Sequence, residues 1–122
     1  MAAGTYDLLI EQGATFLMPV QLSSGGPVDE GGTALDISGC EIRMQIRKKV
    51  SDATPLLSAS TTTGEITITS AVDGQFQIEL PEATTAAIAW TSGVYDLELE
   101  TVGGYVKRYL QGKVKVSKEV TR

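Results

Sequence analysis

The chain has 122 residues, a length typical of one domain, and its 42% hydrophobic and 20% charged residues are the balance of a globular protein. Thirteen glycines, many threonines and few long helix formers favour an all-β class. The net charge of −5 argues against a nucleic-acid partner, which usually requires a basic surface. The chain has no histidine, so the commonest general base and metal ligand is missing.

The lone Cys40 excludes an intrachain disulfide, and we expect it to be a buried, inert thiol. No apolar stretch approaches the roughly 20 residues of a membrane span. The first five residues lack the basic and apolar regions of a signal peptide. We therefore expect a protein that is made in a cytoplasm and has no membrane partner.

Alternating side chains predict strands over residues 5–12 and 14–22. Pro19 cannot donate to a sheet ladder, so the second strand should lie at an edge or bend there. The glycine-rich residues 23–33 predict a long hairpin loop. Cys40–Arg47 is the cleanest strand, with alternate apolar side chains inward and charged or polar ones outward.

The second half continues as short strands with turn signals between them. A proline opens one or two helical turns over Pro81–Ala89, and a Gly-Gly turn joins the last two strands into a hairpin. The domain over residues 1–122 is therefore predicted to be an immunoglobulin-like antiparallel β-sandwich of seven or eight strands with one short helical crossover. The further strands are predicted over residues 56–60, 65–69, 75–80, 93–101 and 105–116.

The outer faces of three predicted strands carry charges of a single sign. Opposite charges on neighbouring strands stabilise a sheet by roughly 0.2–1 kcal/mol per pair. We therefore expect the acidic strand 93–101 to lie between the basic strands 40–47 and 105–116. The acidic residues are Asp96, Glu98 and Glu100, and the basic ones are Arg43, Arg47, Lys107, Lys113 and Lys115.

Two residues near the end of the chain need a separate interpretation. Arg108 breaks the inward phase of Val106, Leu110, Val114 and Val116, so it should lie at the sheet end or beside a bulge. Tyr95 follows the helical crossover, which is typical of a tyrosine corner whose hydroxyl ties the crossover to the strand, or of simple core packing. The alternation predicts a core that includes Phe16, Met18, Ile42, Met44, Ile46, Ile78, Leu80, Leu97, Leu99 and Val114.

No catalytic residue, metal ligand or cofactor-binding residue is predicted. Asp96 and Glu98 could form a paired acid and base, but on an exposed charged face a salt-bridge ladder is favoured. Asp29, Glu30 and Asp36 form a loose acidic cluster that could attract calcium, yet the spacing matches no known calcium motif and a solvated loop is favoured.

Two further groups could bind a ligand. The basic run 47–49 is better explained as a strand end than as a nucleic-acid patch. Trp90, with Ile88 and Tyr95, could be a platform for a sugar, although core packing is favoured. Nothing in the sequence supports an enzyme.

The order of four segments resembles a family of small tailed-bacteriophage virion proteins. The first is Gln12-Gly-Ala-Thr-Phe16, the second covers Asp36–Lys48, the third Ala83–Thr101, and the fourth Val106–Arg122 with its Val-Ser-Lys-Glu-Val-Thr-Arg terminus. Similar β-sandwich domains stand at the N-termini of baseplate upper proteins and of tail-fibre adaptors. No fibre or receptor-binding region follows the sandwich here, so the resemblance favours a free-standing subunit.

The resemblance implies a structural protein of a tailed-phage virion, acting as an adaptor or docking subunit of the tail, baseplate or neck. It would be assembled in the host bacterial cytoplasm and would contact other virion proteins in multiple symmetric copies, with a homo-oligomer as one option. A capsid decoration protein is the alternative within this class. A carbohydrate-binding module is the alternative from another class.

Overall fold

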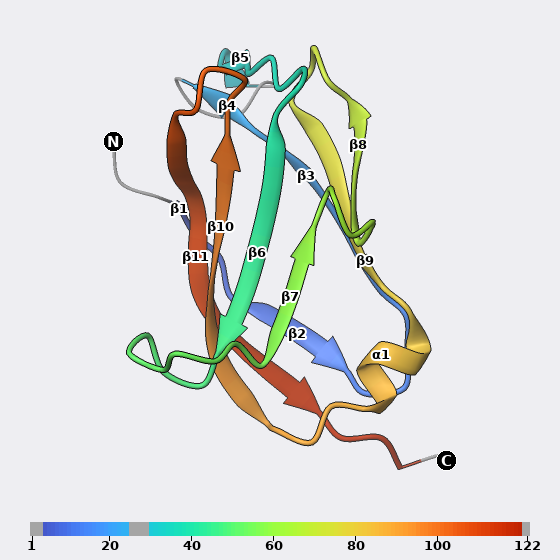
Figure 1. Cartoon of the computed structure of the whole chain (residues 1–122). Coiled ribbons are helices and arrows are strands. Elements are labelled where there is room, and N and C mark those ends of the chain that lie inside the picture. Colours follow the sequence, from blue (N-terminus) through green and yellow to red (C-terminus); the bar gives the residue numbers. More distant parts are fainter. Residues whose placement is uncertain (1–3, 25–29, 121–122) are drawn as a thin grey trace.

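The computed structural model describes residues 4–24 and 30–120, which form a mostly β fold with one short helix (Figure 1). Within these residues, most strands are short, and the two longest are the last two in the chain. The elements are β1 (Gly4–Thr5), β2 (Leu8–Glu11), β3 (Phe16–Gln21), β4 (Ser23–Ser24), β5 (Thr33–Ala34), β6 (Glu41–Arg47), β7 (Leu57–Ser60), β8 (Ile66–Ser70), β9 (Gln75–Leu80), α1 (Glu82–Ala86), β10 (Ser92–Glu100) and β11 (Val106–Ser117).

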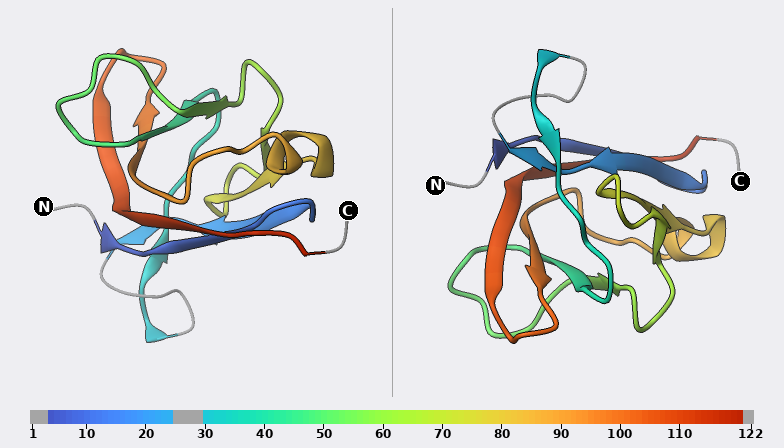
Figure 2. Two further views of the ribbon diagram at one scale, coloured as in Figure 1. Left: turned by 90° about the horizontal axis from the view of Figure 1, so that it is seen from below. Right: turned by 90° about the horizontal axis from the view of Figure 1, so that it is seen from above.

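The larger sheet has six strands in the order β1-β11-β10-β6-β7, with β2 also paired to β11. The smaller sheet has the order β3-β9-β8, and β4 pairs with β5 in a separate hairpin. Figure 2 shows the long strand β11 bending, so that its last residues run beside β2. The strand β3, which contains Pro19, lies at an edge of its sheet, as expected from that proline.

The core is formed by the inward side chains of both sheets. Eight of the ten residues predicted for the core are buried, and the other two, Phe16 and Met18, are partly buried and pack against it. The predicted register is therefore confirmed for β6, β9 and β10, because a shift by one residue would have exposed these side chains. The buried eight are Ile42, Met44, Ile46, Ile78, Leu80, Leu97, Leu99 and Val114.

The predicted order of the three charged strands is confirmed, because β10 pairs antiparallel with both β6 and β11. The expected bulge is also present. Leu97 lies opposite Leu110 while Glu98 lies opposite Arg108, so Tyr109 is an extra residue in β11. This extra residue reverses the side-chain phase before it, which leaves Val106 half exposed and opposite Glu100. The prediction that Val106 points inward was therefore wrong.

The N-terminal strand differs most from its prediction. It divides into β1 and β2, and both run parallel to β11 rather than antiparallel. The larger sheet is thus mixed, and the described residues contain more strands than the seven or eight expected. The hairpin predicted over residues 23–33 is present as β4 and β5, while residues 25–29 lie outside the described residues.

The short helix α1 and the last hairpin match their predictions. Pro81 precedes α1 with an extended backbone, and its carbonyl accepts hydrogen bonds from the amides of Thr84 and Thr85. The turn between β10 and β11 contains Gly104, whose φ of 90° favours glycine. In the described part of the chain, α1 is too short to cross a membrane.

Candidate docking surfaces

The acidic face of β10 forms an ion-pair ladder, as predicted. Arg43 of β6 lies 2.8 Å from Glu100 and 3.4 Å from Glu98, measured from guanidinium nitrogen to carboxylate oxygen. The hydrogen bond to Glu100 contributes most to raising the pKa of Arg43. On the other side, Arg108 lies 3.4 Å from Asp96. These groups are partly exposed and each pair contributes at most about 1 kcal/mol, so the ladder is structural rather than catalytic.

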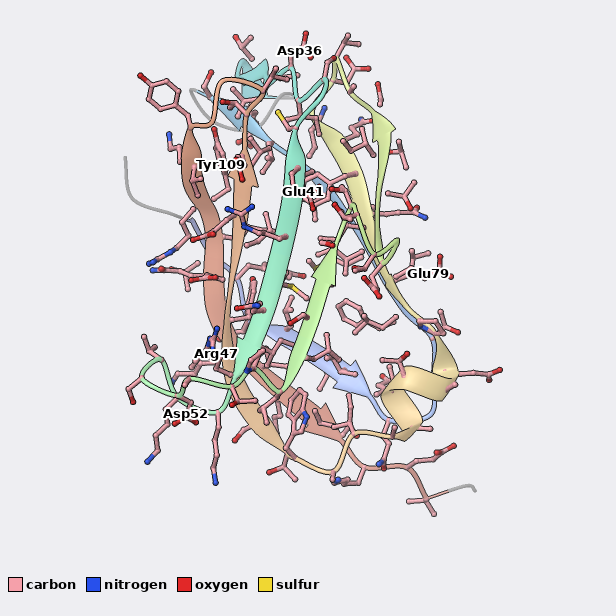
Figure 3. The ribbon with its side chains drawn as sticks, in the orientation of Figure 1. Asp36, Glu41, Arg47, Asp52, Glu79 and Tyr109 are labelled. Atoms are coloured by element: carbon pink, nitrogen blue, oxygen red, sulfur yellow. The ribbon has the colours of Figure 1, made fainter. Side chains whose placement is uncertain are left out.

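The predicted partners of the ladder are only partly correct. Among the described residues, the ion pairs of β11 use Arg108, not the three lysines that were expected to pair with β10. Arg47 instead donates hydrogen bonds to the Asp52 carbonyl at 2.8 Å and to the Gln45 side chain at 2.7 Å. Figure 3 shows Arg47 and Asp52 together at the end of β6 where the 48–56 loop begins. Arg47 therefore holds that loop rather than the acidic strand.

A shallow groove of about 540 Å³ lies over the outer face of the larger sheet. Its lining combines basic, acidic and apolar side chains, with the buried Tyr95 below them. Burial raises the pKa of the Tyr95 phenol to about 12, so this hydroxyl is protonated at neutral pH. The residues around it include Arg47, Val94, Asp96, Arg108, Gln111 and Lys113.

Beside this groove, hydrogen bonds hold the N-terminal segment against β10 and β11. The hydroxyl of Tyr95 donates to the carbonyl of Tyr6, and the amide of Lys113 donates to the Asp7 carboxylate at 2.9 Å. Gly112 is required for this approach, because a Cβ there would lie 2.4 Å from the Tyr6 oxygen. Of the two interpretations of Tyr95, the tyrosine corner is wrong, because the hydroxyl binds the N-terminal segment. Core packing is confirmed, because Tyr95 is buried in the hydrophobic core.

At the end of the molecule near α1, three distant segments meet in a clasp, defined here as Gln12, Gly13, Thr85, Ile88 and Glu119. The amide of Gly13 donates to the Thr85 hydroxyl at 3.1 Å. The Gln12 side chain donates to the Ile88 carbonyl and accepts from the Glu119 amide, both at 2.9 Å. Three of the four segments that carry the resemblance therefore meet at this one place.

The exposed apolar side chains gather partly at the tip of the β10–β11 hairpin. Tyr105 is 82% exposed, Val102 is 79% exposed and Val106 is 51% exposed. The sequence analysis predicted Val106 to point inward and made no prediction for Val102 and Tyr105, which lie at the Gly-Gly turn. Such side chains at a projecting tip are suited to contact with another protein.

The structure also places the other groups considered from the sequence, so far as they lie in its described residues. Glu30 and Asp36 are exposed, Asp29 lies outside the described residues, and hydrogen bonds from Ser38 lower the pKa of Asp36. Among the described residues, no group of three or more acidic, cysteine or histidine side chains is placed to hold a metal ion. Trp90 is partly buried against the core.

Cys40 is half buried rather than fully buried as expected. Its burial, with a smaller effect of Asp36, raises the pKa of the thiol, so it stays protonated and weakly nucleophilic.

Comparison with protein families finds no matching family model, and comparison with curated proteins finds no matching relative.

Proposed function

We propose that the chain is a structural protein of a tailed-phage virion, which acts as an adaptor or docking subunit of the tail, baseplate or neck. The observation that carries this proposal is the ordered set of four segments, from Gln12–Phe16 to Val106–Arg122, that resembles small virion proteins. The proposed partners are other virion proteins, contacted in multiple symmetric copies in the assembled particle.

The strand order supports the finer part of the proposal, an immunoglobulin-like sandwich. In such a sandwich, the third main strand lies beside the last two in one sheet, and the second sheet is built from strands that precede the third and strands that follow it. The order β11-β10-β6-β7 facing β3-β9-β8, with α1 as the crossover into β10, agrees with that arrangement. An N-terminal strand parallel to the last strand is compatible with it.

The character of the surface supports docking rather than turnover. The carboxylates of β10 are occupied by Arg43 and Arg108, and the groove beside them is built around a protonated phenol. The hairpin tip instead offers Val102 and Tyr105 to a partner. A subunit that repeats such a contact by symmetry gains strength through multivalency, even where each contact is weak.

The test is an inventory of purified phage particles by mass spectrometry and electron cryomicroscopy, with the copy number of the chain. The proposal expects the chain in the particle at a symmetric copy number, at the tail, baseplate or neck. Location on the capsid shell would instead identify a decoration protein. Absence from the particle, together with saturable binding of an oligosaccharide to the purified chain, would refute the proposal and favour a carbohydrate-binding module.

A further inference from the structure

The smaller sheet has two edges, β3 and β8, and edge strands offer unpaired backbone N–H and C=O groups to another chain. The amide of Glu79 in β9 donates to the Glu65 carbonyl at 2.8 Å. Hydrogen bonding alternates along an antiparallel ladder. The backbone N–H and C=O groups of odd-numbered residues in β9 therefore point toward β8, and those of even-numbered residues point toward β3. The same alternation fixes which backbone groups of β3 and β8 face outward.

The edge at β3 is blocked. The β3 residues opposite Ile78 and Leu80 form backbone hydrogen bonds with β9. The backbone groups of Leu17, Pro19 and Gln21 therefore face away from the sheet. Pro19 lies at the middle of that outward set and has no N–H to donate. A partner strand would therefore lose a hydrogen bond at the centre of the edge, and proline at such a position is a common protection against edge pairing.

The edge of the larger sheet at β7 is also covered. β7 has only four residues, and the backbone groups of Ser60 are occupied from the following turn. The Ser60 amide donates to the Glu65 carboxylate at 3.3 Å, and the Ser60 carbonyl accepts from the Gly64 amide at 3.1 Å. Little of this edge remains for a partner.

The edge at β8 has no such protection. Ile66 and Ile68 direct their backbone groups outward, and no hydrogen bond from the described residues reaches that side of them. The strand Ile66–Ser70 contains no proline and no charged residue. A register shift between Ile68 and Ser70 marks an irregularity that ends the regular edge after Ile68.

We propose that β8 pairs antiparallel with β8 of a second copy of this chain, about a two-fold axis at Thr67. Ile66 of one copy would then exchange hydrogen bonds with Ile68 of the other, and the two smaller sheets would form one continuous sheet. The contact is self-complementary, as a two-fold interface requires. This pairing names a partner for the docking role, and its place in a particle rests on the proposed function.

The β8 edge is the place where the net charge of the chain opposes a second copy least. Each copy carries a net charge of −5, so two copies repel at most surfaces. The uncharged β8 strand lets them approach, and Thr67 of the two copies would face each other across the axis. Thr69 lies beyond the regular part of this edge, which ends at Ile68. The regular edge is short, so the isolated dimer is expected to be weak.

Two matched variants test the register. Thr67 and Thr69 are both exposed on the same strand, so T67K and T69K add the same charge to the same face. T67K places two lysines opposite each other and should raise the dimer dissociation constant about threefold to tenfold. T69K places its lysine beyond the regular part of the edge and should leave the constant nearly unchanged.

Sedimentation velocity over a range of protein concentrations measures the association, with circular dichroism to confirm that each variant is folded. Hydrogen exchange measured by nuclear magnetic resonance locates the contact between the two copies. The amides of Ile66 and Ile68 should become more protected as concentration rises, while the amide of Leu17 at the blocked edge should not. A variant L17K should associate like the wild type.

Three results would overturn the pairing: a monomer at every concentration, an equal effect of T67K and T69K, or exchange at Ile66 and Ile68 that does not depend on concentration. Any of these can occur while the chain is found in phage particles, in which case the proposed function stands without this dimer. Conversely, a dimer with the expected variant effects and absence from particles would refute the function alone.

Discussion

Replacing Thr85 by valine tests the clasp near α1. The Thr85 side chain is fully buried in α1, and its hydroxyl accepts from the Gly13 amide at 3.1 Å. The same hydroxyl is placed to donate to the Ala14 carbonyl at 2.8 Å or the Glu82 carbonyl at 3.1 Å. Valine has nearly the same shape, so it removes these hydrogen bonds without opening a cavity.

The main cost of T85V comes from the Gly13 amide, which is half buried and would lose its acceptor. Leaving such a donor unsatisfied costs about 1–3 kcal/mol. The Ala14 carbonyl belongs to an exposed residue and can bind water instead, so it adds little. We expect the free energy of unfolding to fall by about 2 kcal/mol, which corresponds to a melting temperature lower by roughly 6–10 °C in a domain of this size.

Urea unfolding followed by circular dichroism measures this change, with T84V as the control. Thr84 lies next to Thr85 in the same helix but is exposed, so T84V makes the same chemical change and should alter stability by less than about 0.5 kcal/mol. T85S keeps the hydroxyl and should lose less stability than T85V. Equal stability of T85V and T84V would refute the role of the hydroxyl in joining the three segments.

Three further substitutions test other parts of the structure. Y95F removes the hydrogen bond to the Tyr6 carbonyl and should lower the free energy of unfolding by about 1 kcal/mol in urea titrations, with no change at neutral pH from ionisation because burial raises the Tyr95 pKa to about 12. G112A places a Cβ 2.4 Å from the Tyr6 oxygen and should lower the free energy of unfolding by about 1–3 kcal/mol. In the control G103A, the added Cβ meets nothing closer than 3.9 Å, so its stability should be nearly unchanged. Equal effects of the two variants would contradict the close contact between Gly112 and the N-terminal segment. The hydrogen bond from the Thr63 hydroxyl lowers the pKa of Glu65 in the folded protein. The ionised Glu65 carboxylate therefore stabilises the fold above the unfolded pKa of about 4.3, and this stabilisation is lost as pH falls through the folded pKa. Thermal unfolding of E65Q across the acidic range should therefore show a weaker pH dependence than the wild type.

Strict alternation and charge made the centre of the fold predictable. The β6 strand carries apolar residues at every second position and polar or charged residues between them, including Arg43 and Arg47, so both its register and its neighbour β10 could be predicted from local sequence. The ion-pair ladder along β10 was predicted, but not every residue that forms it. Tyr109 shifts the phase of β11, so Arg108 rather than Lys107 reaches the acidic face. The sequence signalled this irregularity only through the position of Arg108.

The N-terminal strand and the clasp could not be predicted because their partners are distant in sequence. Nothing in the alternation of residues 5–12 distinguishes a parallel partner from an antiparallel one. Gln12 meets Glu119 across 107 positions, and each is an ordinary polar residue in its own segment. The buried Thr85 likewise belongs to a threonine-rich helix in which local pattern does not show which hydroxyl points inward.

The clasp also bears on what the family resemblance means. The segments beginning at Gln12, Ala83 and Val106 meet there, so folding is sufficient to explain why those residue types occur in that order. A motif that holds the fold together does not select a partner. We therefore expect partner choice to depend on parts of the chain outside the four segments, where the open edge of β8 and the exposed Val102 lie. Variants at those two places should change association and leave the free energy of unfolding nearly unchanged, whereas variants of Thr85 should do the reverse.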